Sequence, residues 1–457
     1  MELKRDIYEE LLKWKKADTG KVLEVRGARQ TGKTYIIDKF SRENYKTYIY
    51  INMVQTSGEE FLECLDQVAD WKPGEPRKDK ALQEAFKLFD GRFEDCEDTI
   101  VVIDEIQESA RVYSLIRQFS REFTSKFVVT GSYLGKTLSR DYFKPVGDLD
   151  ILTLYSLSYE EFLDAFGKRE LYDEIDLYGG SSHEGYDELK KYYDIYCQIG
   201  GYPAVVKRYL EDQDISACMG ELHKVIQIFI EESQSYFEDI LEVNLFGQLL
   251  PAIAHTMIKE KKGSDDLITE LSKIVYKQES NRVTKKSINQ TIAWLFRSHI
   301  IDFCGKANEC SPVNVSMNSR FYFMDVGVCK YFLDMAGADL PTLRGILSEN
   351  FVYIELLKRI REFKMAGTAP MFGTYKEGEI DFLINSRENY KNYGVEVKAG
   401  KSEGKTAQQL LKDEKVEAVY FLKGDTYGGM AGRKITVPIY LVGRVQFDYE
   451  RGNEKTS

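Results

Sequence analysis

The sequence predicts an α/β protein in which two α/β regions are separated by a mainly helical one. Three observations support this prediction. Strands alternate with helices over about the first 160 residues, long helical patterns follow, and short apolar strands return after about residue 336. The chain has 457 residues, and domains usually contain about 100–200, so we expect several domains.

The first region is predicted to be a parallel sheet with helices on both faces. Ile7, Leu11 and Trp14 recur near helical spacing, which indicates an opening amphipathic helix. Apolar runs predict strands at 22–25, 47–53, 99–103 and 127–130, with helices at 34–40 and 113–123. Because strands and helices alternate, the strands are expected to run parallel.

The later regions have different patterns. Long helical stretches begin near residue 157, interrupted at 171–186 by a segment that we interpret as an exposed insertion. Two helical patterns within 265–303, followed by an apolar run at 300–304, suit a winged-helix-like module. The last region predicts helices at 349–363 and 406–412 and strands at 380–384, 393–398, 418–422 and 435–441.

Composition excludes several classes of protein. With 63 Lys and Arg against 74 Asp and Glu, the net charge is −11, which argues against a protein that coats nucleic acid. The 43% hydrophobic content is that of a folded chain, and no apolar run approaches the roughly 20 residues of a membrane helix. Seven scattered Cys and four His do not suggest zinc. With no signal-peptide pattern, we expect a cytoplasmic protein that does not contact membranes.

A glycine-rich loop supplies the strongest functional signal. A complete Gly-x-x-x-x-Gly-Lys-Thr motif lies between a predicted strand and a predicted helix, the context that a phosphate-binding loop requires. We expect the loop residues to bind nucleotide: Gly27, Ala28, Arg29, Gln30, Thr31, Gly32, Lys33 and Thr34. Lys33 would reach the β- and γ-phosphates, and the Thr34 hydroxyl would bind magnesium.

Two neighbouring strand ends supply the other parts of this site. The buried strand 99–103 ends in Asp104 and Glu105, at the sheet edge where such folds bind ligands. Asp104 would hold magnesium, and Glu105 would orient or activate the attacking water. Ser132, after the next strand, would lie beside the γ-phosphate, or would belong only to a turn that ends the strand.

The motifs together resemble a prokaryotic AAA-type P-loop ATPase family whose members carry an uncharacterised C-terminal domain. The resemblance runs from about residue 6 to about residue 400. It rests on these segments: 27–34, Asp104-Glu105-Ile106-Gln107, Thr130-Gly131-Ser132, Leu157 to Phe162, Gly200 to Val205, Tyr322 to Gly327, Glu349 to Val352 and Gly378 to Phe382. The family usually has a Gly-Arg pair before the Leu-Ser motif. Here that stretch reads Pro145-Val146-Gly147-Asp148, which lacks the Arg and its potential finger role.

The last region contains a second cluster. Asp381 and, fifteen residues later, Glu396-Val397-Lys398 have the spacing of a PD-(D/E)XK nuclease. Alternation places Glu396 and Lys398 on one face of their strand. Asp381 and Glu396 would bind magnesium, and Lys398 would position water. The resemblance to resolvase-like members implies Glu349 as a third carboxylate.

Two other readings of this cluster stay open: acidic and basic residues on an exposed sheet face, and a nuclease fold that binds DNA without cutting it. Residues 336–457 carry 19 Lys and Arg against 17 Asp and Glu, so the chain's acidity lies elsewhere. Such a near-neutral region is compatible with a phosphate-backbone contact. Lys285 and Lys286 would suit a DNA-contacting helix in the winged-helix-like module, although a solvated face explains them equally well.

We therefore predict a P-loop NTPase sheet, a helical and winged-helix region, and a smaller nuclease-like domain. The expected domains are an AAA-type ATPase domain at 1–160, a helical lid region at 161–262, a winged-helix-like module at 263–335 and a PD-(D/E)XK nuclease-like domain at 336–457. The expected function is magnesium-dependent ATP hydrolysis coupled to the last domain. The alternative is a slow nucleotide-gated switch or sensor with an inactive nuclease fold. Expected partners are the nucleotide, DNA or a protein, and further copies of the chain.

Overall fold

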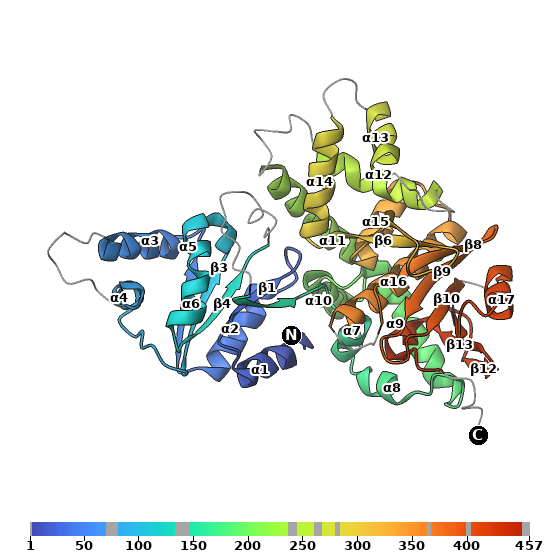
Figure 1. Ribbon diagram of the computed structural model, residues 1–457, viewed down its shortest axis with the longest axis horizontal. Helices are drawn as coiled ribbons and strands as arrows, with labels where there is room; N and C mark the ends of the chain where they lie inside the picture. The colour runs from blue at the N-terminus through green and yellow to red at the C-terminus, as the bar shows by residue number, and fades with distance from the viewer. Residues whose placement is uncertain are drawn as a thin grey trace. The chain divides into compact units, whose positions relative to one another are not determined.

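The computed structural model describes residues 2–69, 81–132, 147–235, 245–259, 267–278, 284–362, 367–398 and 404–449. The chain forms two compact units (Figure 1). One comprises Arg5–Tyr155 with Arg297–His299, and we call it the N-terminal unit. The other comprises Met1–Lys4, Ser156–Phe296 and Ile300–Ser457, and we call it the C-terminal unit. Within the described segments, no helix is both long enough and apolar enough to cross a bilayer.

The N-terminal unit contains the predicted parallel sheet. Its strands are β1 (Val22–Arg26), β2 (Thr47–Asn52), β3 (Thr99–Asp104), β4 (Lys126–Thr130) and β5 (Leu149–Thr153). They lie in the order β2-β3-β4-β1-β5, and every neighbouring pair is parallel. The fold class is confirmed. The four predicted strands are present, whereas β5 was not predicted.

Helices cover both faces of this sheet. They are α1 (Ile7–Ala17), α2 (Lys33–Asn44), α3 (Thr56–Ala69), α4 (Ala81–Phe89), α5 (Ala110–Ser114) and α6 (Ile116–Glu122), with a 3-10 turn at Ile106–Glu108. In β3, Ile100 and Val102 pack against α1 and α2, whereas Val101 and Ile103 pack against α3, α4 and α6. A strand with both faces buried needs such a continuous apolar run.

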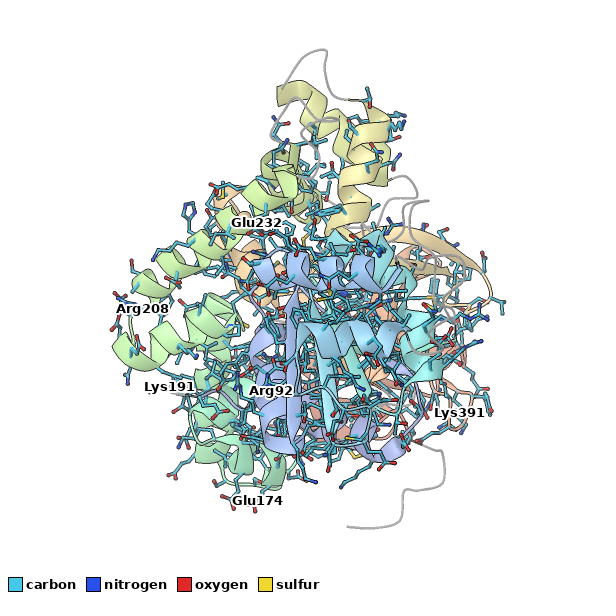
Figure 2. All side chains as sticks on the ribbon, turned by 90° about the vertical axis from the view of Figure 1, so that its left-hand side faces the viewer. Arg92, Glu174, Lys191, Arg208, Glu232 and Lys391 are labelled. Carbon is cyan, nitrogen blue, oxygen red and sulfur yellow. The ribbon has the colours of Figure 1, made fainter. Side chains whose placement is uncertain are left out.

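The C-terminal unit begins with helices: α7 (Tyr159–Ala165), α8 (Arg169–Glu174), α9 (His183–Ile199), α10 (Pro203–Asp212), α11 (Ile215–Ser235) and α12 (Leu245–Lys259). Charged side chains such as Glu174, Lys191 and Arg208 project from their exposed faces (Figure 2). The prediction of an exposed insertion at 171–186 is only partly confirmed, because residues 173, 174, 178, 180 and 182–184 are exposed but others are not. Tyr172 and Tyr186 are buried, and the Arg444 guanidinium donates to the Tyr172 carbonyl at 2.7 Å.

Two further helices and a hairpin follow. Helices α13 (Leu267–Gln278) and α14 (Lys285–Arg297) precede strands β6 (Ile301–Asn308) and β7 (Val315–Phe323), which pair antiparallel. Helices α15 (Val326–Met335) and α16 (Leu340–Arg361) come next. Helix α16 begins nine residues before the predicted start at 349, because Asp339 caps it and Pro341 fits the first turn.

The second sheet is mixed. Its remaining members are β8 (Met371–Tyr375), β9 (Gly378–Asn385), β10 (Asn392–Lys398), β11 (Ala418–Lys423), β12 (Gly429–Ala431) and β13 (Lys434–Pro438), with α17 (Lys405–Lys412) between β10 and β11. The order is β12-β13-β11-β10-β9-β8-β6-β7. The strand predicted at 435–441 ends at Pro438, and a 3-10 segment, Ile439–Arg444, follows.

This sheet joins segments that the sequence assigned to different domains. Strand β6 of the winged-helix-like segment pairs parallel with β8 of the nuclease-like segment. The hairpin β6–β7 therefore extends the second sheet at one edge. The division of the chain into four domains remains a prediction, whereas a single sheet across residue 336 is a structural fact.

Candidate functional site

The phosphate loop connects β1 to α2, and its shape depends on glycine. Gly27 has a φ of 146°, and a Cβ there would lie 2.0 Å from the Leu154 carbonyl oxygen. Gly32 has a φ of 93° and stands at the N-terminus of α2. Only glycine adopts such angles at low cost, so the motif spacing sets the path of the loop. Its position before a helix N-terminus favours an anion.

Lys33 is the buried cation of the loop, with 6% of its surface exposed. Its Nζ donates to the carbonyl oxygens of Gly27 and Ala28, at 3.0 and 2.8 Å, and to the Ser132 hydroxyl at 3.2 Å. Burial lowers the pKa of Lys33 to about 8, although Glu105 and Asp104 act in the opposite direction. A phosphate group would replace these neutral acceptors with a charged one.

Thr34 and Asp104 meet at the carboxyl ends of β1 and β3. The Thr34 hydroxyl donates to the Asp104 carboxylate at 2.8 Å, and the Tyr50 hydroxyl donates to the same oxygen at 2.8 Å. A hydroxyl and a carboxylate are oxygen ligands of the kind that magnesium takes in proteins. These two residues therefore fit the predicted metal role in chemistry and in proximity.

Glu105 stands one residue beyond the end of β3, at a φ of 50°. Its carboxylate lies 3.6 Å from the Arg29 guanidinium and accepts a hydrogen bond from the Gln107 amide at 2.6 Å. The Ser132 backbone N–H lies 3.4 Å from the same carboxylate. The structure thus brings Lys33, Thr34, Asp104, Glu105 and Ser132 together, as the sequence predicted.

Arg5 also belongs to this neighbourhood, and sequence reasoning missed it. The side chain is buried, and its guanidinium donates to the Thr31 carbonyl in the phosphate loop at 2.8 Å. It also donates to the Tyr155 carbonyl at 2.7 Å. A buried arginine that binds two carbonyls holds both segments in place. No motif marks Arg5, since its partners lie 26 and 150 residues away.

The residues 133–146 lie outside the described segments. They include Pro145 and Val146 of the stretch in which the related family carries its Gly-Arg pair.

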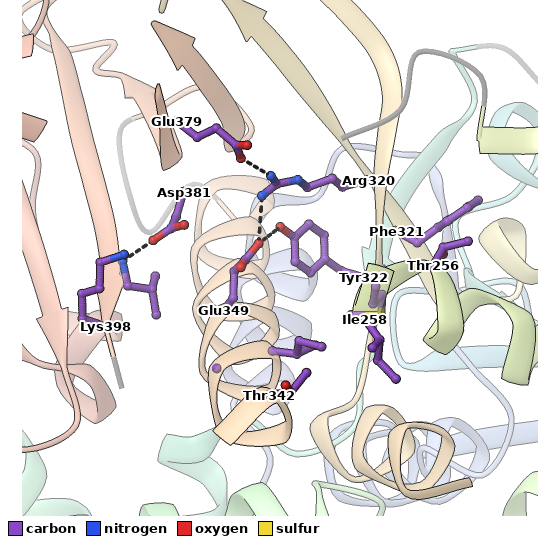
Figure 3. A pocket seen from close by; sticks show the side chains of 14 residues that line it. Thr256, Ile258, Arg320, Phe321, Tyr322, Thr342, Glu349, Glu379, Asp381 and Lys398 are labelled. Atoms are coloured by element: carbon purple, nitrogen blue, oxygen red, sulfur yellow. Dashed lines mark hydrogen bonds and ion pairs between the residues drawn. The ribbon is translucent and has the colours of Figure 1, made fainter. Parts of the chain in front are cut away.

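The second predicted cluster lies on three elements of the C-terminal unit. Glu349 is on α16, Asp381 is on β9, and Lys398 is on β10 (Figure 3). Glu396 is also on β10. The Asp381 carboxylate accepts from the Val397 backbone N–H at 2.6 Å, and Lys398 pairs with Glu396 at 2.7 Å. Strands β9 and β10 pair antiparallel.

Electrostatic interactions show that these carboxylates are neighbours. Burial raises the pKa of Asp381, and Glu349 and Glu396 raise it further. Burial also raises the pKa of Glu396, against the effect of Lys398. Glu396 is only 4% exposed, so the reading of an exposed sheet face does not hold for this residue.

Three further polar residues line the same place and were not predicted: Arg320, Tyr322 and Glu379. The Arg320 guanidinium lies 3.2 Å from Glu349 and 2.5 Å from Glu379, and the Tyr322 hydroxyl donates to Glu349 at 2.5 Å (Figure 3). Arg320 and Tyr322 come from β7, which the sequence assigned to another module. Alternation along β7 puts both on one face, but nothing local indicates what that face meets.

These residues surround a cavity of about 380 Å³. Its walls include Thr256, Met257 and Ile258 of α12, and Thr342, Gly345 and Ile346 of α16. The Oε2 atom of Glu396 is buried and has no hydrogen-bond partner among the described residues. Such an orphaned carboxylate oxygen fits a cation ligand in chemistry. In this arrangement, however, no described group of three or more His, Cys, Asp or Glu residues could hold a metal ion.

Other residues of the resemblance have structural roles. Asp325 accepts hydrogen bonds from the backbone N–H groups of Gly201 and Gly327, both at 2.9 Å. A Cβ at Gly200 would lie 2.2 Å from the Asp325 carboxylate. The Asn350 side chain bonds the N–H and the carbonyl of Phe323, at 3.0 and 2.9 Å. These motifs therefore fix the packing of α9, α10, α15 and α16.

Two segments of the chain match known protein families. Residues 19–163 match the family model described as "AAA domain", and residues 190–339 match a "Domain of unknown function (DUF8612)". The Walker-type ATPase of Pyrococcus abyssi is similar at 12% identity and a TM-score of 0.43, over 72% of this chain and 96% of that one. The Thermotoga maritima RuvB Holliday junction branch migration motor is similar at 13% identity and a TM-score of 0.31, over 69% and 92%.

A search of curated proteins found no match. The AAA domain match spans β1 to β5, the phosphate loop and the Asp104-Glu105 strand end. Residues 19–163 therefore have the AAA-type P-loop ATPase fold.

Proposed function

We propose that this protein binds ATP with magnesium in its N-terminal unit and hydrolyses the γ-phosphate. The observation that carries the proposal is the assembly of Lys33, Thr34, Asp104 and Glu105 at the end of a parallel sheet. Lys33 would bind the β- and γ-phosphates, while Thr34 and Asp104 would hold the metal. Magnesium would neutralise phosphate charge when bound.

Glu105 would orient the attacking water. Its ion pair with Arg29 and its hydrogen bond from Gln107 position the carboxylate. Ser132, bonded to Lys33, would sense the γ-phosphate through that lysine.

Two variants test this site. Lys33→Ala should lose ATP binding, because the buried cation of the loop is removed, and Glu105→Gln should bind ATP but hydrolyse it slowly. ATP affinity is measured by calorimetry and turnover by phosphate release. Lys46→Ala, at an exposed lysine on the same unit, is the matched control and should behave as the parent. Hydrolysis at the parent rate by Lys33→Ala would refute the assignment.

We further propose that the cavity of the C-terminal unit is a magnesium-dependent phosphodiester site to which the nucleotide state is coupled, with DNA as the polymer. Support comes from the gathering of Glu349, Asp381, Glu396 and Lys398. Asp381 and Glu396 would hold the cation, with Glu349 close by, and Lys398 would position water.

A nicking experiment tests this second site. Plasmid DNA is incubated with magnesium and ATP, and with the parent protein, Asp381→Ala or Lys398→Ala. Both variants should lose nicking, because each removes a group that contacts the cation or the water. Lys412→Ala, at an exposed lysine of α17, is the control. Equal nicking by all four proteins would rule the cluster out.

The alternative is a slow nucleotide-gated switch with an inactive nuclease fold, which recruits DNA or a protein. The absence of a Gly-Arg pair at 145–148 favours it. Steady-state turnover with and without DNA separates the two readings. Fast hydrolysis stimulated by DNA would exclude the switch, whereas slow, unstimulated turnover with no nicking would support it.

A further inference from the structure

Arg320 is a fixed internal cation of the cavity in the C-terminal unit. Only 11% of its side chain is exposed, and its guanidinium lies 3.9 Å from the centre of the Phe372 ring. Nη1 reaches Glu349 at 3.2 Å and Nη2 reaches Glu379 at 2.5 Å (Figure 3). One guanidinium therefore bridges a carboxylate of α16 and a carboxylate of β9.

One oxygen of the Glu349 carboxylate is occupied by these contacts. Arg320 and the Tyr322 hydroxyl both bind its Oε1 atom, at 3.2 and 2.5 Å. A carboxylate oxygen that already accepts two hydrogen bonds, one of them from a guanidinium, has less electron density to offer a metal ion. The predicted third carboxylate is thus engaged by protein donors in this arrangement.

The cavity has an excess of negative charge. Three carboxylates, on Glu349, Glu379 and Asp381, line it with two cations, Arg320 and Lys398, and Lys398 is already paired with Glu396. Independently of charge, the buried Oε2 atom of Glu396 lacks a partner among the described residues. A divalent cation would balance the excess negative charge and give the Glu396 Oε2 atom a partner, if Glu349 were also available as a ligand.

The cavity also has room for a phosphate ligand. Its volume of about 380 Å³ lies within the roughly 300–1,000 Å³ of small-molecule sites. Arg320 and Lys398 both line it. A guanidinium binds phosphate oxygens in the same two-pronged geometry in which it binds carboxylates, so phosphate can replace a carboxylate as its partner.

We propose that Arg320 exchanges Glu349 for a phosphate group, and that the released Glu349 then joins Asp381 and Glu396 in holding a divalent cation. The ligand class is a phosphate mono- or diester together with magnesium or manganese. The inference rests on the proposed phosphodiester site and adds its regulation: without phosphate, the bridge formed by Arg320 keeps the cation out. By linkage, phosphate and cation must then strengthen each other's binding by one common factor.

The experiment uses the full chain in a Lys33→Ala background, which silences the ATP site. Binding of Mn²⁺ is followed by electron paramagnetic resonance, with and without thymidine 5′-monophosphate, and mixtures without protein correct for direct association of the two. In this background the nucleotide should lower the Kd for Mn²⁺ severalfold. Mn²⁺ should lower the Kd for the nucleotide by the same factor.

Substitution of Arg320 then isolates its role. Arg320→Met should bind Mn²⁺ more tightly without nucleotide, and the coupling factor should fall to about one. Tyr322→Phe removes the other donor to Glu349 and should tighten Mn²⁺ binding less, with the coupling retained. Arg344→Met, at an exposed arginine of the same helix α16, is the control and should match the parent.

Two results would overturn the exchange while leaving the phosphodiester site intact: Mn²⁺ binding that ignores the nucleotide, or weaker Mn²⁺ binding in Arg320→Met. A different result would remove the site itself. If neither the parent nor the two variants bound Mn²⁺, and Asp381→Asn made no difference, then the proposed phosphodiester site would fail together with the exchange.

Discussion

The phosphate loop and the C-terminal cavity each hold a lysine beside carboxylates, yet the two lysines respond in opposite ways. Burial lowers the pKa of Lys33 to about 8, against the effects of Glu105 and Asp104, and its three hydrogen-bond acceptors are neutral. Burial also lowers the pKa of Lys398, but Asp381 and Glu396 outweigh that effect and raise it. The phosphate loop is therefore ready to bind an anion at its lysine. In the C-terminal cavity, the carboxylates of Asp381 and Glu396 already act on Lys398 as its anions.

The first test of this contrast changes the backbone conformation of the phosphate loop. Gly27→Ala should abolish ATP binding, with an affinity loss of at least about 100-fold, because the new Cβ would collide with the Leu154 carbonyl and the residue disfavours a φ of 146°. Calorimetric titration with ATP measures the loss. Gly91→Ala, where a Cβ meets nothing within 4 Å, is the control.

Mn²⁺ binding in the C-terminal cavity should be unchanged in Gly27→Ala, since the two sites are formed by different segments of the chain. A parent-like ATP affinity in Gly27→Ala would contradict the loop geometry.

A smaller effect is expected from Arg5. Arg5→Met should weaken ATP binding about tenfold, because two buried charge-assisted hydrogen bonds, to Thr31 and Tyr155, are lost and the loop gains freedom. ATP titration measures the change, and thermal unfolding checks that the fold persists. The control is Arg42→Met, at an exposed arginine on α2. If ATP affinity stayed at the parent value, Arg5 would have no positioning role.

The smallest effect is a pH dependence that separates the two lysines. ATP binding requires protonated Lys33, and the free protein loses that proton as pH rises through about 8. ATP affinity should therefore fall above pH 8, by at most about tenfold per pH unit, with proton uptake on binding. Calorimetry in buffers of different ionisation enthalpy measures this uptake.

Lys398 should not titrate in the same range, because its pKa is raised. Phosphate-dependent Mn²⁺ binding should thus keep its strength between pH 8 and 9. Proton uptake at the ATP site that persisted in Lys33→Met would assign the titration to another group.

The same linkage affects stability. In the unfolded chain Lys33 titrates near its ordinary value of 10.5, so between about pH 8 and 10.5 the unfolded state binds more protons than the folded state. The folded state without nucleotide therefore carries a cost from Lys33 at neutral pH. That cost is relieved as pH rises through this window.

The two sites also differ in how far the sequence predicted them. The residues of the loop are contiguous. Because β4 pairs in parallel with both β1 and β3, the carboxyl ends of these strands share one edge of the sheet, so Lys33, Asp104, Glu105 and Ser132 could be placed together in advance. Arg5 could not, because an arginine that binds two backbone carbonyls leaves no pattern in the sequence.

Only some of the residues that form the cavity could be predicted from the sequence. The short hairpin between β9 and β10 brought Asp381 near Glu396, which spacing alone implied. Arg320 and Tyr322 arrive from β7 through a sheet whose order is not the chain order. The insertion expected at 171–186 was only partly right for a similar reason: polar and glycine residues suggested exposure, but Tyr172 and Tyr186 pack inside the unit.

By itself the sequence determined the parallel sheet, the phosphate loop and the two clusters of charged residues, because each depends on local periodicity, on glycine, or on spacing within one hairpin. The tertiary structure decided which cation faces which carboxylate. Arg320 meets Glu349 and Glu379, and Arg5 meets Thr31, only because distant segments pack together. Burial then sets the charge behaviour of each lysine, since desolvation and neighbouring charges depend on surroundings that no local pattern specifies.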